Sequence, residues 1–124
     1  GLPLERYELM LRVWRECGYL IDTHTAVASR VLGDYRARTG DETPAIVVST
    51  ASPYKFCADV LAALGEVTDG MNGFACMDAL EQLTGTAAPP QLSGLRAGEV
   101  LHDDVCDPER VGAFVESACA RVFL

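Results

Sequence analysis

Apolar residues recur at helical spacing in the first third of the chain. Those between positions 4 and 17 fall on one side of a helix and Gly18 follows as a natural stop, so the spacing predicts a helix over residues 3–17. A second apolar face begins after Thr23, which can cap a helix, and Gly40 closes that segment. The pattern therefore predicts two helices before residue 41.

A different pattern follows the second predicted helix. Residues 46–48 (IVV) are a continuous β-branched run, which is typical of a strand buried on both faces of a parallel sheet. Ser52 can then cap a helix, Pro53 suits its first turn, and helical spacing continues until Gly65. This order predicts a buried strand, a tight turn and a helix.

Helical spacing returns twice in the C-terminal half. An apolar face runs through residues 71–83, and Gly85 follows it as a stop. A second stripe begins at Val111, is opened by Asp107-Pro108, and continues to the end of the chain. We expect both segments to be helices.

The stretch between these two helices contains a further candidate strand. Residues 87–98 are rich in proline and glycine and are predicted to be loop, whereas residues 100–102 (VLH) are short and apolar. Helices that alternate with short buried strands indicate an α/β architecture. We therefore expect a partial three-layer αβα unit built on a parallel sheet.

Composition narrows the possible partners. The chain has 124 residues, 49% hydrophobic and 23% charged, which fits a single globular domain. Ten basic and eighteen acidic residues give a net charge of −8, and Lys55 is the one lysine in the sequence, so nucleic acid and anionic membranes are not expected as partners. No apolar run approaches the roughly 20 residues that span a bilayer.

The N-terminus adds two expectations. It lacks the basic and apolar regions of a signal peptide, so the sequence predicts a cytoplasmic protein. The chain also starts Gly-Leu-Pro without an initiator methionine, which indicates a fragment of a longer protein. We expect residues 1–124 to form a single piece of that protein.

The cysteine pattern predicts neither disulfides nor a metal site. Five cysteines are widely spaced, odd in number and never arranged as CxxC, so we expect buried, reduced thiols. His102 has no second candidate ligand at metal-binding spacing, so it is interpreted as a structural residue. No metal-binding residue is therefore predicted.

The candidate chemistry lies directly after the first predicted strand. Ser49 and Thr50 place hydroxyls at its carboxyl end, where open α/β sheets bind ligands. Lys55 follows at about the third position of a helix, where a cation opposes the helix dipole. Lys55 either binds an anion or a buried carboxylate, or it is a solvated lysine that tolerates a small loss of stability.

Two segments resemble signatures of threonine synthases. Residues 49–56 (STASPYKF) resemble one found near the C-terminus of these enzymes. Residues 18–28 (GYLIDTHTAVA) resemble a second signature that precedes it, and the order is the same here. Residues 90–95 (PQLSGL), 101–102 and 105–107 are similar to the end of the family, so the resemblance extends over essentially the whole chain.

The resemblance implies a pyridoxal-phosphate (PLP) enzyme with the tryptophan-synthase-like fold type II. Such an enzyme eliminates phosphate from O-phospho-L-homoserine and adds water to give L-threonine. In the family the Schiff-base lysine and a glycine-rich phosphate loop come from earlier sequence, so this chain is expected to lack both and to be inactive alone. Its partner would be the N-terminal remainder of the enzyme.

Two other functional interpretations are possible for the same residues. The chain could be a free-standing acidic α/β module that binds an anion or a partner without catalysis. Lys55 could instead be the Schiff-base lysine of a second enzyme, but nothing else in the sequence would hold the cofactor phosphate with several backbone amides. The two signatures favour the threonine synthase fragment.

The resemblance also assigns roles to individual residues. Thr50 matches the position whose hydroxyl faces the pyridine nitrogen of PLP, with Ser49 assisting; otherwise Thr50 only satisfies a backbone group. A neutral hydroxyl there leaves the ring nitrogen largely unprotonated and weakens its electron sink. Asp22 and His24 are candidates for contacts with substrate or an anion, although we favour helix capping by Asp22 or Thr23 and a wall position for His24.

Overall fold

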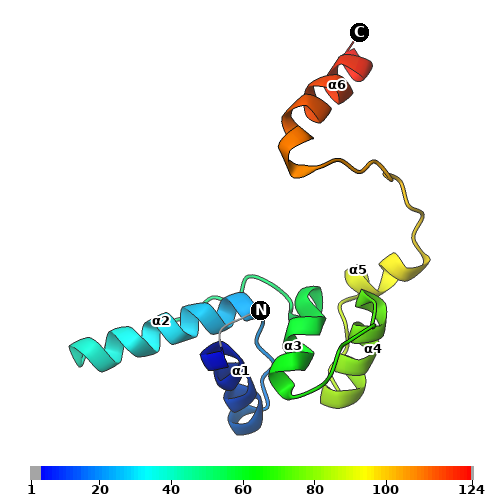
Figure 1. The fold of residues 1–124 in the computed structure, drawn as a ribbon. Coiled ribbons are helices and arrows are strands. Elements are labelled where there is room, and N and C mark those ends of the chain that lie inside the picture. Colours follow the sequence, from blue (N-terminus) through cyan, green and yellow to red (C-terminus); the bar gives the residue numbers. More distant parts are fainter. Residues whose placement is uncertain (1–3, 124) are drawn as a thin grey trace.

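The computed structural model describes residues 4–123, and its helices fall into two groups (Figure 1). Helices α1 to α5 gather into one body, and α6 stands away from them at the end of an extended segment. The elements are α1 (Leu4–Cys17), α2 (Thr23–Thr39), η1 (Pro53–Phe56), α3 (Cys57–Leu64), α4 (Gly73–Thr84), α5 (Pro90–Ser93), η2 (Gly94–Ala97), η3 (Pro108–Arg110) and α6 (Val111–Phe123).

Polar caps and glycines set the ends of the longer helices, and the glycine stops are those that the sequence predicts. The side chain of Asn72 caps α4 by accepting the Ala75 N–H at 2.9 Å. Gly40 follows α2 with φ of 69°, a left-handed conformation that glycine adopts without strain. Asp22, and not Thr23, is the N-cap of α2. The predicted start of α1 at residue 3 lies outside the described residues.

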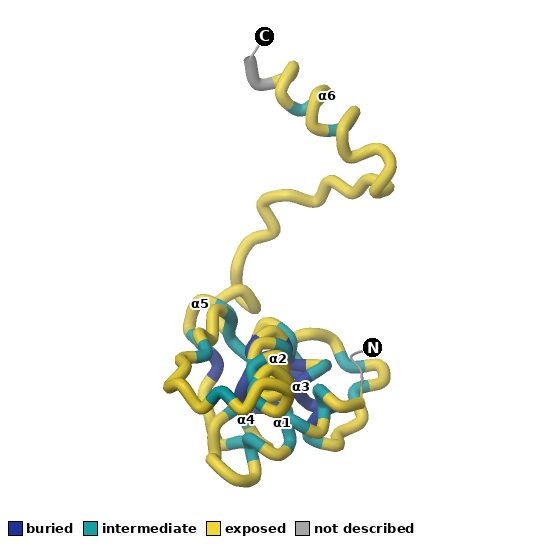
Figure 2. Tube along the Cα trace, turned by 90° about the vertical axis from the view of Figure 1, so that its left-hand side faces the viewer, coloured by how far each residue is buried: buried dark blue, intermediate teal, exposed yellow. Residues whose placement is uncertain are grey.

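Helix α3 lies at the centre of the body. It packs against α1 on one side and α4 on the other, and α1 also contacts α2. Val60 and Leu61 of α3 and Leu80 of α4 are almost completely buried, and Figure 2 shows the buried residues confined to this body. Burial of this apolar surface is the main force that holds the helices together.

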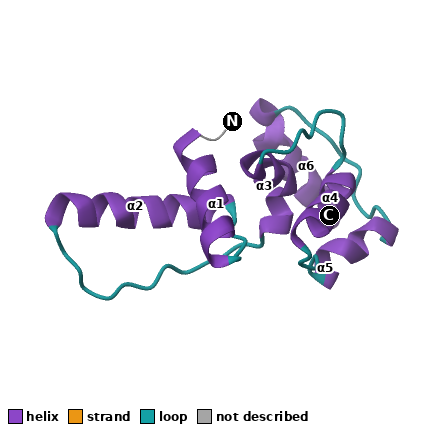
Figure 3. Cartoon of the chain, turned by 90° about the horizontal axis from the view of Figure 1, so that it is seen from below, coloured by secondary structure: helices purple, strands orange, loops and turns teal. Residues whose placement is uncertain are grey.

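The predicted α/β class is wrong. Residues 4–123 contain helices and loops and no strand (Figure 3). The run at 46–48 is a loop in which Ile46 is 92% exposed, and residues 100–102 are also exposed loop. A strand needs a hydrogen-bonded neighbour along its backbone, and the described residues supply none to either run. β-Branched composition alone therefore did not produce a sheet.

The predicted loop at 87–98 is wrong in part. It contains the short helices α5 and η2, and Pro90 occupies the first position of α5. A proline at that position has its φ already fixed for a helix, and its missing N–H would have no partner there. Composition rich in proline therefore marked a helix start here.

The last predicted helix is confirmed as η3 and α6, but its apolar stripe is not buried. Val111 and Val115 are about half exposed, and Phe114 is half-buried. The side chain at position 122, which belongs to the same predicted stripe, lies outside the described residues. Among the described residues, no helix has the length and apolar character needed to cross a membrane.

The five cysteines are free thiols, as predicted. Cys57 and Cys76 are buried between α3 and α4, which matches the expectation. The other three, Cys17, Cys106 and Cys119, are exposed, so the expectation of burial is wrong for them. The described residues hold no cluster of three or more side chains that could bind a metal ion.

Candidate functional site

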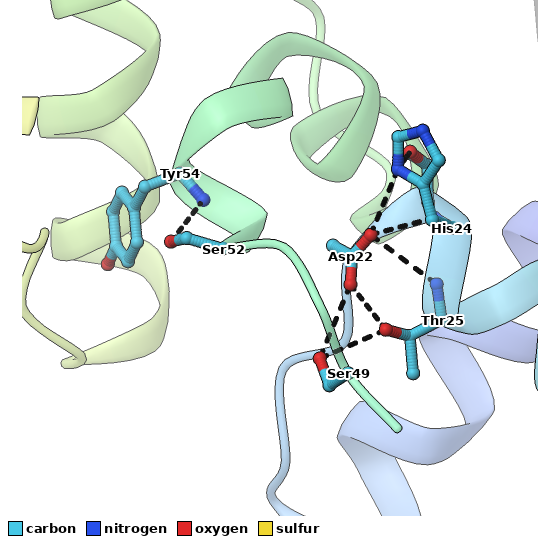
Figure 4. A network of polar contacts seen from close by, with 7 residues as sticks. Asp22, His24, Thr25, Ser49, Ser52 and Tyr54 are labelled. Atoms are coloured by element: carbon cyan, nitrogen blue, oxygen red, sulfur yellow. Dashed lines mark hydrogen bonds and ion pairs between the residues drawn. The ribbon is translucent and has the colours of Figure 1, made fainter. Parts of the chain in front are cut away.

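The first turn of α2 is built around a buried carboxylate (Figure 4). The side chain of Asp22 is completely buried. Its Oδ1 accepts the backbone N–H of His24 at 2.8 Å and that of Thr25 at 3.4 Å. These bonds satisfy two of the amides that a helix N-terminus leaves without an intrahelical partner.

The other oxygen of this carboxylate faces a distant part of the chain. The hydroxyl of Thr25 donates to Oδ2 of Asp22. The Ser49 hydroxyl oxygen lies 3.0 Å from Oγ1 of Thr25 and 3.4 Å from Oδ2 of Asp22. The three side chains therefore join the start of α2 to the loop that precedes η1.

His24 links the same turn to η1. Its Nδ1 lies 3.1 Å from Oδ1 of Asp22, and its ring centroid lies 4.8 Å from that of Phe56 in a tilted arrangement. The side chain is 63% exposed, so one side of the ring faces solvent. His24 thus packs against Phe56 at this turn while its side chain stays largely exposed.

Hydrogen bonding keeps the Asp22 carboxylate ionised. Burial pushes its pKa upward, but the Thr25 hydroxyl, the two backbone amides and the His24 side chain push it down, and the pKa is lowered overall. The positive end of the α2 dipole acts in the same direction. Asp22 is therefore an anion whose oxygens are occupied by donors from its own chain.

Thr50 and Lys55 lie on the solvent side of this cluster. Both residues are exposed. Lys55 belongs to η1, whose N-cap Ser52 accepts the Tyr54 N–H at 3.2 Å, as its predicted capping role requires. Among the described residues Lys55 forms no ion pair, and Thr50 takes no part in the bonds around Ser49.

Comparison with known proteins identifies the family. The family model described as "Threonine synthase, C-terminal" matches residues 25–115, which is more than half of the chain. The chain belongs to this family. No curated protein matches the sequence.

The threonine synthase match covers part of the cluster. It includes Thr25, Ser49, Thr50 and Lys55, and it begins after Asp22 and His24. The structure joins Ser49 to Thr25 and Asp22, and Asp22 in turn to His24. Thr50 and Lys55 are exposed and take no part in these bonds. The sequence-based analysis predicted ligand contacts for five residues, and these contacts stay predictions: Asp22, His24, Ser49, Thr50 and Lys55.

Thr25 is the member of the cluster that the sequence-based predictions missed. It lies three residues after the N-cap Asp22, the position from which a side chain reaches back toward the cap. The sequence Asp-Thr-His-Thr therefore carried a local signal for the contact between Thr25 and Asp22. The contact with Ser49, 24 residues away, had no such local signal.

Two neutral hydroxyls are adjacent in the loop that precedes η1. Thr50 offers an exposed neutral hydroxyl beside Ser49, whose own hydroxyl is held by the buried cluster. A hydroxyl can donate to a pyridine nitrogen or accept from it. The sequence contains no glycine-rich phosphate loop, and a contact of these hydroxyls with a cofactor stays a prediction.

Proposed function

We propose that this chain is the C-terminal portion of a PLP-dependent threonine synthase, a lyase that converts O-phospho-L-homoserine and water to L-threonine and phosphate. The observation that carries the proposal is the family match over residues 25–115, which contains the Ser49-Thr50 pair. When bound, PLP supplies the electron sink for the elimination of phosphate. The chain's own residues bind and orient it.

Thr50 is proposed to face the pyridine nitrogen of the cofactor. Its hydroxyl is neutral at physiological pH, so it holds the nitrogen by a hydrogen bond without favouring ring protonation. Ser49 is proposed to assist from the adjacent position. The support is the exposed Thr50 hydroxyl beside a Ser49 side chain that is tied to the buried Asp22.

Lys55 is proposed to attract the phosphate of the substrate. It is an exposed cation in the first turns of the helical segment formed by η1 and α3, where backbone amides also favour an anion. The ring of His24 contacts that of Phe56, the residue after Lys55, and His24 is proposed to border the same anion. Asp22, a buried anion, is proposed to contribute by holding the turn in place.

We place the lysine that binds PLP covalently, and the cofactor phosphate site, on the N-terminal remainder of the enzyme. Exposed apolar side chains support the proposal that the N-terminal remainder covers a large surface of this chain. An apolar groove lies between α2 and residues 45–48, and Val31, Ile46 and Val48 on its walls are each more than 60% exposed. Such patches typically mark surfaces that another part of a protein covers.

A Thr50→Val substitution in the complete enzyme tests the proposed function. Valine keeps the shape of threonine and removes the hydroxyl, so the pyridine nitrogen loses its hydrogen-bond partner. We expect kcat to fall roughly ten- to a hundred-fold, which corresponds to about 1–3 kcal/mol, with the melting temperature unchanged. The measurements are turnover of O-phospho-L-homoserine, the PLP absorption spectrum and a thermal melt.

Thr68→Val, in the loop between α3 and α4, is the matched control. It makes the same chemical change away from the Ser49-Thr50 pair and should leave turnover and spectrum unchanged. If Thr50→Val also matched the wild type in kcat, kcat/KM and spectrum, the proposed cofactor contact would be wrong. A chain that binds only an anion or a partner would then explain the site better.

A further inference from the structure

The loop before η1 is held to the body by one side chain. Residues 44–51 form no regular secondary structure, and most of them are exposed. Within residues 4–123, their side-chain hydrogen bonds to the rest of the chain are those of the Ser49 hydroxyl, to Thr25 and to Asp22. Residues 45–48 and α2 line an open apolar groove, and Ile46 and Val48 on it stay largely exposed.

The other end of this attachment lies in the buried first turn of α2. Asp22 is completely buried and caps α2, and Thr25 is 6% exposed on the same turn. Hydrogen bonds to a carboxylate are shorter and stronger than those between neutral groups. Thr25 is β-branched, so its χ1 angle is restricted and its hydroxyl stays aligned. The cluster therefore offers Ser49 a fixed point.

We infer that Asp22 and Thr25 are positioning residues that hold Ser49, and through it the adjacent Thr50, in the orientation needed for the proposed cofactor contact. The inference rests on the proposed function for its purpose and on the observed contacts for its mechanism. Consecutive Cα atoms are only about 3.8 Å apart, so fixing Ser49 restricts where Thr50 can lie.

The restricted position of Thr50 matters for catalysis, because the rate depends on how precisely reacting groups are placed. A loop without backbone partners samples many conformations, and fixing each residue costs conformational entropy. A misplacement of about 1 Å at a reacting group can reduce the rate about a hundred-fold. The buried carboxylate orders the loop in advance. The Thr50 hydroxyl is therefore already in position before the cofactor and substrate bind.

The first test measures the loop in this chain without cofactor. Thr25→Val removes the hydroxyl that bridges Asp22 and Ser49 and keeps the side-chain shape. We expect the backbone order parameters of Ser49 and Thr50 from ¹⁵N relaxation to fall into the flexible range, below about 0.6. Thr25→Ser, which restores a hydroxyl, should return them toward the wild-type values.

Thr23→Val is the matched control for this test. Thr23 lies in the same turn and is nearly as buried, at 7% exposure, but its hydroxyl contacts His24 and not Ser49. It should leave the order parameters of the loop unchanged. Ser49→Ala removes the bridge from the exposed side, where folding is not at risk, and should loosen Thr50 as Thr25→Val does. Unchanged order at Thr50 in both Thr25→Val and Ser49→Ala would overturn the inference.

The second test uses the complete enzyme and separates the inference from the proposed function. Thr25→Val should lower kcat about ten-fold or more, change KM less, and alter the PLP spectrum, with recovery in Thr25→Ser. If the loop loosens but kcat and the spectrum stay at wild-type values, the anchoring is confirmed and the cofactor contact is wrong. If the loop stays ordered while Thr50→Val alone lowers kcat, the cofactor contact stands and the anchoring is wrong.

Discussion

Leu61 of α3 and Val115 of α6 occupy equivalent positions in the apolar stripes of two amphipathic helices, yet their surroundings differ completely. Leu61 is 1% exposed in the body, whereas Val115 is 50% exposed in the arm formed by residues 98–123. Figure 1 shows why, because α6 lies away from every helix of the body. The comparison separates the ability to form a helix from the presence of something to pack against.

The two regions therefore depend on different forces. Helices of the body gain stability from apolar surface removed from water, about 25 cal/mol per Å². Helix α6 has 13 residues and relies mainly on its own backbone hydrogen bonds, and isolated helices of this length are marginal in water. Core substitutions should therefore have large effects on stability, and arm substitutions small ones.

Truncation of one core leucine gives the largest expected effect. Leu61→Ala should lower the free energy of unfolding by about 2–5 kcal/mol, because it leaves a cavity between α1, α3 and α4. Val115→Ala, the same kind of truncation in the arm, should change it by less than about 0.5 kcal/mol. Urea titrations followed by the fluorescence of Trp14 in α1 measure both. Equal losses in the two variants would show that α6 packs as the body helices do.

The buried polar cluster should contribute less than the apolar core but more than the surface. Asp22→Ala leaves the donors of His24 and Thr25 without their acceptor, and we expect it to cost about 1–3 kcal/mol. Asp34→Ala, which breaks an exposed pair with Arg30 in the same helix, should cost at most about 1 kcal/mol. Chemical denaturation of both variants checks the ranking. A smaller loss in Asp22→Ala than in Asp34→Ala would contradict the anchoring role of the carboxylate.

The contribution of Asp22 should depend on pH in a definite direction. Its folded-state pKa is lowered below the ordinary value near 3.8, so the unfolded chain binds the proton more readily. The stabilisation is therefore fully present above the unfolded pKa and is lost as the pH falls through the folded pKa. The stability difference between wild type and Asp22→Asn should stay constant from pH 7 to about 5 and shrink on further acidification. A difference that grows toward low pH would reverse the assigned sign.

The smallest expected effect lies at the junction of body and arm. Arg96 of η2 contacts Asp78 of α4 at 2.5 Å and lies over the ring of Phe74 at 5.3 Å. Arg96→Met keeps much of the aliphatic stem and removes these polar contacts, so we expect a loss of at most about 1 kcal/mol. Arg110→Met, in the arm, is the control and should have no measurable effect on the melting temperature.

Local patterns in the sequence predicted the helices well and the fold class badly. Helix ends were visible because a cap or a glycine acts within one turn, as at Ser52 and Gly40. The strand at 46–48 was wrong because a β-branched run only makes pairing favourable, and the partner must come from elsewhere. The exposure of α6 was not visible either, since periodicity shows a face and not what covers it.

The candidate site was predictable to the same limited extent. Asp22 was one of two candidate caps, with Thr23 as the other, and the structure selects Asp22. Ser49 and Thr50 were singled out as the end of a predicted strand, which is a loop in the structure. The bridge from Ser49 to Thr25 depends on tertiary folding across 24 residues, which local spacing cannot show. Sequence patterns thus identified most members of the cluster and not the contacts that join them.

The separation of α6 from the body also governs how the molecule moves through water. A compact chain of 124 residues would have a radius of gyration of about 14 Å. The arm places α6 far from the centre of mass, and the radius of gyration depends on the square of that distance. The chain therefore experiences more friction, diffuses more slowly and tumbles less uniformly than a sphere of its mass.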